Sequence, residues 1–330
     1  MMDFTPAGSQ QAVARLAAEI LTEPEPWKAL AQAGLLDATS LGVLDITTLL
    51  TEIGRRRPSL KAHATLMTGA LPLLRWGRPD LLPADLTLTA ALREPSRPEP
   101  DPPATAVTNG TITGIKIGVP YAGQSDLILV PAATGVALVD PHTQQVTLTR
   151  TPTSSGEPEY TLRLDHAPIQ DLIGGTDCVR DLYQLATAGA CALADGAVAG
   201  ALALTRDHVA TRQQFGRPLA AFQAVSQQIA DVYIASRTLH LATLSACWRL
   251  DTGLDAGPEV DPEVDTALEV AGFWCAEQAP RSVRICHHLH GGLGMDVTYP
   301  LHRFSSLVAD LVRYLGGAEY RLERLACSST

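Results

Sequence analysis

Three long segments in the second half of the chain have the apolar spacing of helices, and they constrain the fold more than any other feature. The first, residues 178–208, is rich in Ala and Gly, which suits a helix with close neighbours on several sides. The second and third cover residues 222–250 and 264–290, and a fourth follows Pro300. Long helices with short connections predict an antiparallel bundle over residues 173–330.

The first half of the chain divides into a helical part and a strand-rich part. Apolar residues recur at helical spacing in 10–21 and 44–53, whereas 93–103 is rich in proline and charge and predicts a domain boundary or a surface loop. Between 107 and 169, Asn109-Gly110 is a hairpin dipeptide and apolar residues alternate in 115–119 and 160–165. We therefore predict an α+β multidomain fold with an N-terminal helical domain (1–90), a small antiparallel β-domain of five or six strands (91–172) and a C-terminal antiparallel helix bundle (173–330).

Charge and cysteine content narrow the class of protein. The 330 residues carry a formal net charge of −10, which argues against nucleic acid as a partner because a duplex binder needs a basic face. The six cysteines contain no C-x-x-C pair, and most lie within helical apolar patterns, so we expect buried thiols in a reducing compartment.

The sequence also predicts a cytoplasmic protein without a membrane segment. The longest Ala- and Leu-rich stretch, 186–204, is interrupted by Thr187 and Asp195. The first four residues, Met1-Met2-Asp3-Phe4, lack the basic and apolar regions of a secretory signal.

Generic motifs of phosphate, hydrolase and metal chemistry are absent from the sequence. It contains no GxxxxGK[ST], GxSxG or HExxH, and the glycines at 291–294 follow a helical pattern instead of the strand that a dinucleotide fingerprint needs. Cys286-His287-His288-Leu289-His290 is the densest group of metal-capable side chains. Adjacent helical residues point about 100° apart, so at most two of them converge, and we predict no metal site.

The most specific local pattern lies between two of the long helical segments. It reads Arg212-Gln213-Gln214-Phe215-Gly216-Arg217-Pro218-Leu219 and is followed by Phe222-Gln223. An arginine at a helix corner can bind a pyrophosphate through two hydrogen bonds. On spacing alone, an arginine that caps carbonyls beside a buried phenylalanine is the better explanation of the pattern.

Several separated motifs together resemble the acyl-CoA dehydrogenase family. Arg212, Phe215 and Gln223 match its R-x-x-F-G-x-x-x-x-x-x-Q signature, which in the family contacts the diphosphate and adenosine of an FAD held by the neighbouring subunit. Residues 288–294 resemble the family's Q-x-x-G-G-x-G, which approaches the same FAD, and residues 298–303 resemble its E-Y-P-x-x-R/K. The resemblance therefore assigns contacts with FAD to six residues, namely Arg212, Phe215, Gln223, His288, Gly291 and Gly292. His288 stands where the family has Gln, but an imidazole can still donate a hydrogen bond.

The expected catalytic base is missing from both places where the family carries one. A glutamate removes the α-proton of the acyl-CoA while hydride leaves the β-carbon for the flavin. Alignment puts Leu315 at one family position of this glutamate and Ala186 at the other, and neither side chain accepts a proton. Asp195 is the nearest acidic residue downstream of Ala186 on the predicted helix, about 13 Å along the axis. We therefore predict no catalytic residue in this chain.

The part of the family site that holds the flavin ring is also reduced. Family members carry a T-E-P-x-A-G-S-D stretch that cradles this ring, and only Arg93-Glu94-Pro95 remains before Ser96-Arg97-Pro98. Such asymmetry resembles the short, degenerate subunit of the heterotetrameric acyl-CoA dehydrogenases of actinobacterial steroid degradation. Phe4, residues 10–13, residues 286–292 and residues 295–300 carry this finer resemblance.

The resemblance implies a non-catalytic subunit of an FAD-dependent enzyme that desaturates a steroid side-chain CoA thioester. A longer catalytic subunit would supply the glutamate base, the flavin-ring cradle and most of the acyl-CoA site, and an electron-transfer flavoprotein or a similar acceptor would take the electrons. Two alternatives stay open. One is a degenerate scaffold subunit that only stabilises its partner and holds no cofactor; the other is a self-sufficient dehydrogenase that uses Asp195.

Overall fold

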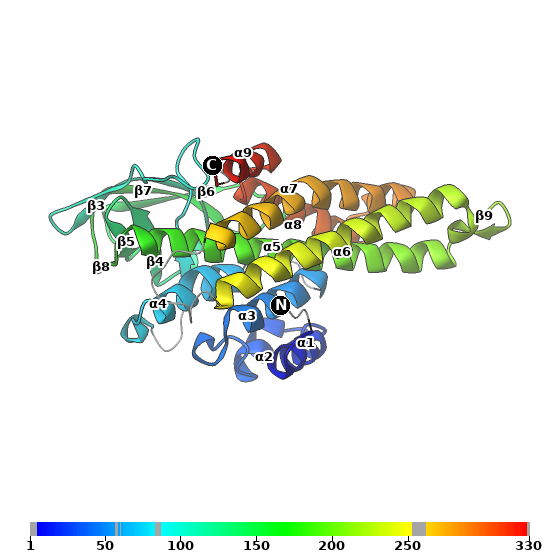
Figure 1. Ribbon diagram of the computed structural model, residues 1–330, viewed down its shortest axis with the longest axis horizontal. Coiled ribbons are helices and arrows are strands. Elements are labelled where there is room, and N and C mark those ends of the chain that lie inside the picture. The colour runs from blue at the N-terminus through cyan, green and yellow to red at the C-terminus, as the bar shows by residue number, and fades with distance from the viewer. Residues whose placement is uncertain (1–4, 57–58, 60, 83–86, 253–261, 329–330) are drawn as a thin grey trace.

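The computed structural model describes residues 5–56, 59, 61–82, 87–252 and 262–328. Helices of the N-terminal part lie along one side of a long helix bundle, and two β-sheets lie at one end of that bundle (Figure 1). The predicted order of helical, β and helical regions is confirmed. Phe4 lies outside the described residues, and the boundaries at 90/91 and 172/173 remain predictions.

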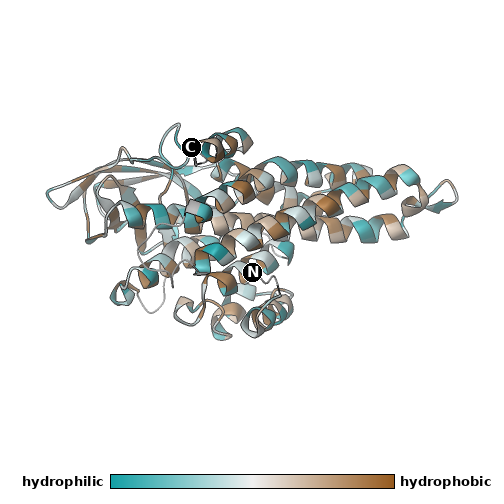
Figure 2. Ribbon diagram, viewed as in Figure 1, coloured by the Kyte–Doolittle hydropathy of each residue, from teal (hydrophilic) through white to brown (hydrophobic). Residues whose placement is uncertain are grey.

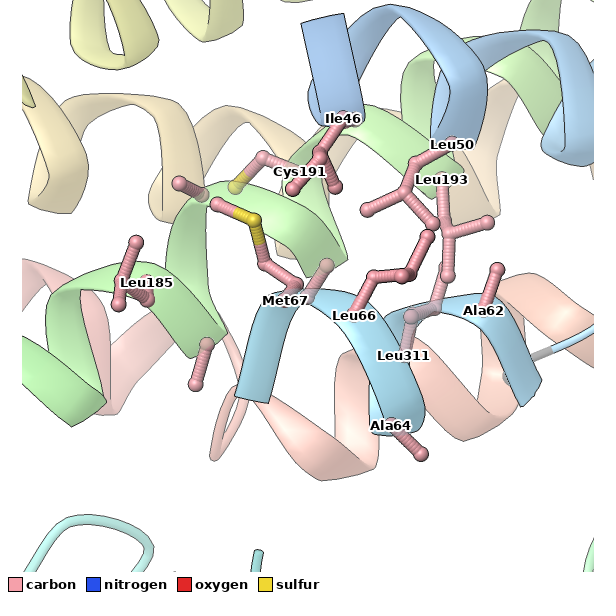
Figure 3. Close-up of a cluster of buried hydrophobic side chains, with 14 of the residues drawn as sticks. Ile46, Leu50, Ala62, Ala64, Leu66, Met67, Leu185, Cys191, Leu193 and Leu311 are labelled. Carbon is pink, nitrogen blue, oxygen red and sulfur yellow. The ribbon is translucent and has the colours of Figure 1, made fainter. Parts of the chain in front are cut away.

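The N-terminal helices bury one apolar face each. They are α1 (Gly8–Ile20), α2 (Pro26–Gln32), η1 (Ala38–Ser40), α3 (Val43–Arg56), the π-helical η2 (His63–Ala70), α4 (Leu71–Arg75) and η3 (Pro79–Leu81). Helix α3 places apolar residues three or four positions apart, so Ile46 and Leu50 point into the core. Figure 3 shows them near Leu66 of η2 and Leu193 of the long helix α5 (Thr176–Thr211). The N-terminal helices and the bundle therefore share one core.

Two four-stranded sheets form the β-part, with strand orders β1-β4-β5-β8 and β2-β3-β7-β6. Their strands are β1 (Leu88–Ala90), β2 (Ala106–Thr108), β3 (Thr111–Pro120), β4 (Leu127–Ala132), β5 (Gly135–Val139), β6 (Val146–Thr151), β7 (Glu159–Pro168) and β8 (Asp171–Ile173), with the short helix η4 (Ala122–Gln124) between β3 and β4. We predicted five or six strands, whereas the described residues of the β-part form eight. The prediction that all strands are antiparallel is wrong for β1, which pairs with β4 in parallel. The predicted hairpin at Asn109-Gly110 is confirmed between β2 and β3.

The first sheet is covered on both faces, which explains its uninterrupted apolar runs. Ile128 and Val130 of β4 point into a core between the two sheets. Leu127 and Leu129, which alternate with them, belong to the core shared with the helices. A strand buried on both faces has no polar face, so β4 and β5 lack the alternation seen in β7.

Five α-helices, two short 3-10 helices and a small hairpin make up the rest of the described residues. They are α5, the hairpin β9 (Gln213–Gln214) and β10 (Arg217–Pro218), η5 (Leu219–Ala221), α6 (Gln223–Thr252), α7 (Pro262–His290), η6 (Gly291–Met295), α8 (Leu301–Tyr314) and α9 (Ala318–Ser328). Polar and apolar residues mix along α6 and α7, and the hairpin projects from the end of the bundle that lies away from the sheets (Figures 1 and 2). Helix α5 is long and apolar enough to cross a membrane, but 89% of its most apolar window is buried inside the protein.

Glycines bring the backbones of α3 and α5 unusually close. A Cβ atom on Gly196 would overlap the carbonyl oxygen of Thr51, and one on Gly54 would overlap that of Leu193. Two helix backbones can approach this closely only where glycine, which has no Cβ atom, stands at the contact on both helices. The Ala- and Gly-rich composition of α5 is therefore a packing requirement, as predicted for a helix with close neighbours.

Four of the six cysteines are buried, and all six are free thiols. Burial raises the pKa of Cys286, to about 11, so this thiol stays protonated at neutral pH. Within the described residues no group of three or more His, Cys, Asp or Glu side chains could hold a metal ion.

Candidate functional site

The hairpin after α5 presents an aromatic ring and an arginine to solvent. Arg212 leaves the helix with an extended backbone; its N–H donates to the His208 carbonyl (2.8 Å), and its carbonyl accepts from the Leu219 N–H (2.8 Å). Phe215 and Gly216 form the tip with φ angles of 52° and 78°, which match a two-residue type I′ turn. A left-handed backbone is unfavourable for phenylalanine, yet it leaves the side chain of Phe215 91% exposed.

The side chain of Arg212 has no internal acidic partner. Among the described residues, no carboxylate lies within ion-pair distance of its guanidinium, whereas neighbouring Arg206 binds Asp207 at 2.8 Å. Gln223, the first residue of α6, is also exposed. The alternative of a capping arginine beside a buried phenylalanine is wrong for Phe215, which is exposed.

The second predicted group lies at the same end of the bundle. His290 of α7 stacks on His208 of α5 with ring centroids 4.4 Å apart, and His208 lies one helical turn before Arg212. His290 donates through Nδ1 to the Cys286 carbonyl (2.8 Å), so its Nε2 accepts from the Tyr299 hydroxyl (3.1 Å). Burial lowers the pKa of both stacked histidines, which favours two neutral rings in contact.

All six residues assigned to FAD contacts are exposed at this bundle end. His288, Gly291 and Gly292 lie at the junction of α7 and η6, and a Cβ atom on either glycine would meet open space. Gly291 has a φ of 57°, which other residues adopt only with strain. An unpaired cation, an exposed aromatic face and open glycine backbone suit the diphosphate and adenosine of a nucleotide. These residues fit the nucleotide end of FAD.

A second region gathers the positions at which the family holds its base and flavin ring. The Thr187 hydroxyl, next to Ala186, donates to Glu99 (3.2 Å). Gly316, next to Leu315, packs so closely on Pro98 that a Cβ atom would lie 2.6 Å from its ring. The structure therefore brings together three segments that are far apart in the sequence, as a complete family site would require.

This region contains an ion-pair cluster of Glu99, Arg321, Arg324 and Glu269. Arg321 is buried and binds both carboxylates; its Nε also donates to the Leu315 carbonyl (2.8 Å). Arg324 Nε donates to Glu269 (2.5 Å). The cluster borders a cavity of about 480 Å³ that Asp101 and Arg180 also line. Charged side chains therefore form part of the wall of this cavity, beside apolar ones such as Val179 and Leu268.

The segment 93–103, predicted as a domain boundary or a surface loop, is exposed at 95–97 and 101–102 but also contains buried residues. Glu94 is buried and accepts from Lys116 Nζ (2.8 Å) and from the Thr105 hydroxyl (2.6 Å). Despite its burial, these hydrogen bonds and the charge of Lys116 hold the pKa of Glu94 at about 2. The segment folds inward because partners distant in the sequence neutralise its charges. No local pattern identifies Glu99, Arg321 or Lys116 as partners.

Asp195 faces away from this region. Nine residues separate it from Ala186, which is two and a half turns and places the two on opposite faces of α5. Its Oδ2 accepts from His240 Nδ1 at 2.8 Å. Sequence reasoning had no signal for His240, which lies 45 residues away on α6.

The fully buried His63 predicts a loss of stability in mild acid. Its Nε2 donates to the Ala186 carbonyl (2.9 Å), and burial, partly offset by this bond, lowers its pKa to about 4. The ordinary value is about 6.5, so the unfolded chain takes up a proton first as the pH falls. Between pH 7.5 and 5 we expect wild type to lose about 2 kcal/mol more unfolding free energy than His63→Gln. Urea unfolding at both pH values checks this; equal losses in the two proteins would contradict it.

Comparison with known proteins gives consistent matches over the whole length. The family model described as "Acyl-CoA dehydrogenase, C-terminal domain" matches residues 175–326. Acyl-CoA dehydrogenase FadE28 of Mycobacterium tuberculosis is 44% identical over 347 aligned residues, covering 100% of both chains.

Solved structures of similar fold also match over nearly the whole chain. A chain of the ChsE4–ChsE5 complex of Mycobacterium tuberculosis matches with a TM-score of 0.89 and 29% identity over 99% of each chain. A chain of a variant of the Tcur3481–Tcur3483 steroid ACAD matches with a TM-score of 0.86 and 29% identity over 97% of each chain. Both of these relatives are named as two-component complexes.

Proposed function

Because this chain belongs to the acyl-CoA dehydrogenase family, we propose that it is the non-catalytic subunit of a heterotetrameric, FAD-dependent acyl-CoA dehydrogenase. In this proposal the enzyme forms an α,β-double bond in a steroid side-chain CoA thioester in the cytoplasm. A longer partner subunit supplies the glutamate base, the flavin-ring cradle and most of the acyl-CoA site. An electron-transfer flavoprotein or a similar protein accepts the electrons.

One asymmetry carries the proposal. The residues for the nucleotide end of FAD are exposed, and no carboxylate of the described residues pairs with Arg212, whereas Glu99 and Arg321 form a buried ion pair at the place for a flavin ring and base within the chain. Ala186 and Leu315, at the two base positions, are buried and apolar. A chain built in this way can complete a neighbour's site but has no complete site of its own.

The residues of the bundle end have separate parts in this proposal. The Arg212 guanidinium binds the diphosphate, and the exposed face of Phe215 lies against the adenosine. Gln223 and His288 donate hydrogen bonds, and Gly291 and Gly292 allow close approach of the backbone. FAD would supply the hydride acceptor when bound; the residues of this subunit would hold its nucleotide end and transfer no proton.

Helix α6 supports a large contact with the partner. Tyr233, Ile234 and Leu241 are among its exposed large apolar residues, and Ile234 is 61% exposed. Ile234 and Leu241 lie seven positions apart and so share one face of the helix. Exposed apolar rows of this kind are typical of subunit contacts.

A scaffold subunit that holds no cofactor has no need for Arg212, Phe215 and Gln223 to be exposed together. The scaffold alternative therefore leaves this group of residues at the bundle end unexplained. The self-sufficient alternative would need Asp195 to reach the region of Ala186, which lies on the opposite face of α5.

Flavin counting tests the proposal against both alternatives. We expect the isolated chain to be colourless and poorly soluble, and the complex with its partner to contain one FAD per pair of subunits. Absorbance of the released flavin against protein concentration measures this ratio. A yellow, active homo-oligomer of this chain would refute the proposal. Two FAD per pair would also refute it, because each subunit would then hold its own ring. Flavin content independent of this chain would favour the scaffold.

A further inference from the structure

A cavity of about 460 Å³ lies between α1, α3, α5 and α6. This cavity is not the one beside the ion-pair cluster. Asp195 and Ala192 of α5 line it, whereas Ala186, which lies near the cluster, is on the opposite face of α5 from Asp195. The volume falls in the range that holds small organic ligands. Nothing in the proposed function uses this cavity.

Most of the cavity wall is apolar. Leu44 of α3, Ala192 of α5 and Leu244 of α6 line it, together with the ring of Trp248. An apolar wall with a few converging polar groups is the usual form of a small-molecule site. The chemistry of a ligand therefore depends on where the polar groups lie.

One pair of polar groups consists of Asp195 and His240. The Asp195 side chain is only 4% exposed, and such burial of a carboxylate is unfavourable unless a partner compensates it. A carboxylate can only accept, so His240 Nδ1, 2.8 Å from Asp195 Oδ2, donates the hydrogen bond. An imidazole that carries its one proton on Nδ1 has an acceptor at Nε2. Glu52 and Arg55 also line the cavity and pair with each other (3.2 Å), so the carboxylate of Asp195 is a further negative charge, which disfavours an anionic ligand.

The Thr243 hydroxyl is the second polar group. Thr243 lies three residues after His240, so both side chains share one face of α6, and both line the cavity. Thr243 is 5% exposed, and its Oγ1 is buried without a hydrogen-bond partner in the described part of the chain. By contrast, Thr238 on the same helix donates to the carbonyl four residues before it (3.0 Å). A buried hydroxyl without a partner is unfavourable, and a ligand that forms a hydrogen bond with it would remove this penalty.

We propose that this cavity binds a neutral, mainly apolar small molecule that carries one hydroxyl group. The ligand hydroxyl donates its proton to His240 Nε2 and accepts one from the Thr243 hydroxyl, while the carbon skeleton lies against Leu44, Leu244 and Trp248. Asp195 is a positioning residue, because its bond to Nδ1 keeps Nε2 as an acceptor.

Equilibrium dialysis of the full chain, in complex with its partner subunit, tests this proposal with two probes of similar shape. 2-Naphthol carries the hydroxyl and naphthalene lacks it. We expect one saturable 2-naphthol site per copy of this chain, with naphthalene binding about tenfold more weakly. Equal affinity for the two probes, or no saturable binding, would overturn the proposal.

Variants locate the site within the complex. Thr243→Val, which keeps the side-chain shape, should remove most of the preference for 2-naphthol, whereas the matched Thr238→Val should leave it unchanged. Thr48→Trp on α3 places a ring in the cavity and should abolish binding of both probes. Unchanged binding in Thr243→Val, or in a Thr48→Trp protein that retains wild-type circular dichroism, would place the probe elsewhere and contradict the assignment.

Discussion

Replacement of Arg212 by alanine is expected to strip most of the flavin from the enzyme complex. A guanidinium on a diphosphate makes charged hydrogen bonds worth about 1.5–3 kcal/mol each, and Arg212 has no internal partner within the described residues that would compete for it. Loss of one bidentate contact therefore lowers FAD affinity by about 100-fold or more. Flavin absorbance of the purified complex, followed by titration with added FAD, measures the change.

Two variants make the result specific. Arg206→Ala, on the last turns of the same helix, removes an exposed arginine that already binds Asp207 and should leave flavin content unchanged. Arg212→Lys keeps the charge but loses the planar pair of donors, so its affinity should fall between those of wild type and Arg212→Ala. Full flavin occupancy in Arg212→Ala would remove this residue from the cofactor site.

Addition of a single methyl group at Gly196 is expected to unfold or severely destabilise the protein. In helix interiors alanine is favoured over glycine by about 1 kcal/mol, so propensity alone predicts a gain. The new Cβ atom would overlap the Thr51 carbonyl oxygen and crowd the Arg55 N–H, both of which are backbone atoms held within α3. Neither can move without separating the two helices. We expect Gly196→Ala to lose at least about 3 kcal/mol of unfolding free energy.

The matched control is Gly8→Ala at the start of α1, where a Cβ atom meets nothing within 4 Å. Its stability should stay within about 0.5 kcal/mol of wild type or rise. Thermal and urea unfolding of both variants make the comparison. Wild-type stability in Gly196→Ala would show that α3 and α5 tolerate a wider separation than the structure has.

The helices were predictable because their signals are local. Residues 178–208 were predicted as a helix, and α5 extends from Thr176 to Thr211; residues 264–290 were predicted, and α7 extends from Pro262 to His290. Apolar spacing within such a window is enough to identify a helix. The three-residue strand β1 escaped prediction because its parallel pairing with β4, 39 residues later, leaves no local pattern.

The proposed cofactor-binding motif was also predictable from a local pattern, since Arg212, Phe215 and Gln223 lie within twelve residues. The sequence identified these three residues as a motif, but it did not show that their side chains are exposed. Phe215 could have been a core residue, and the left-handed turn that exposes it depends on the hairpin register of β9 and β10.

Residue order alone predicted the long helices and showed that Ala186 and Leu315 stand at the two aligned base positions, because helix periodicity and short motifs act over a few neighbouring positions. Three-dimensional packing decided that Glu99 meets Arg321 across 222 residues, that Asp195 meets His240 across 45, and that the two groups of nucleotide-binding candidates lie at one bundle end. Buried charges must find a partner wherever the backbone places one, since an unpaired charge in the interior is too unfavourable to persist. Such pairings have no signature in a local window, so only the folded chain reveals them.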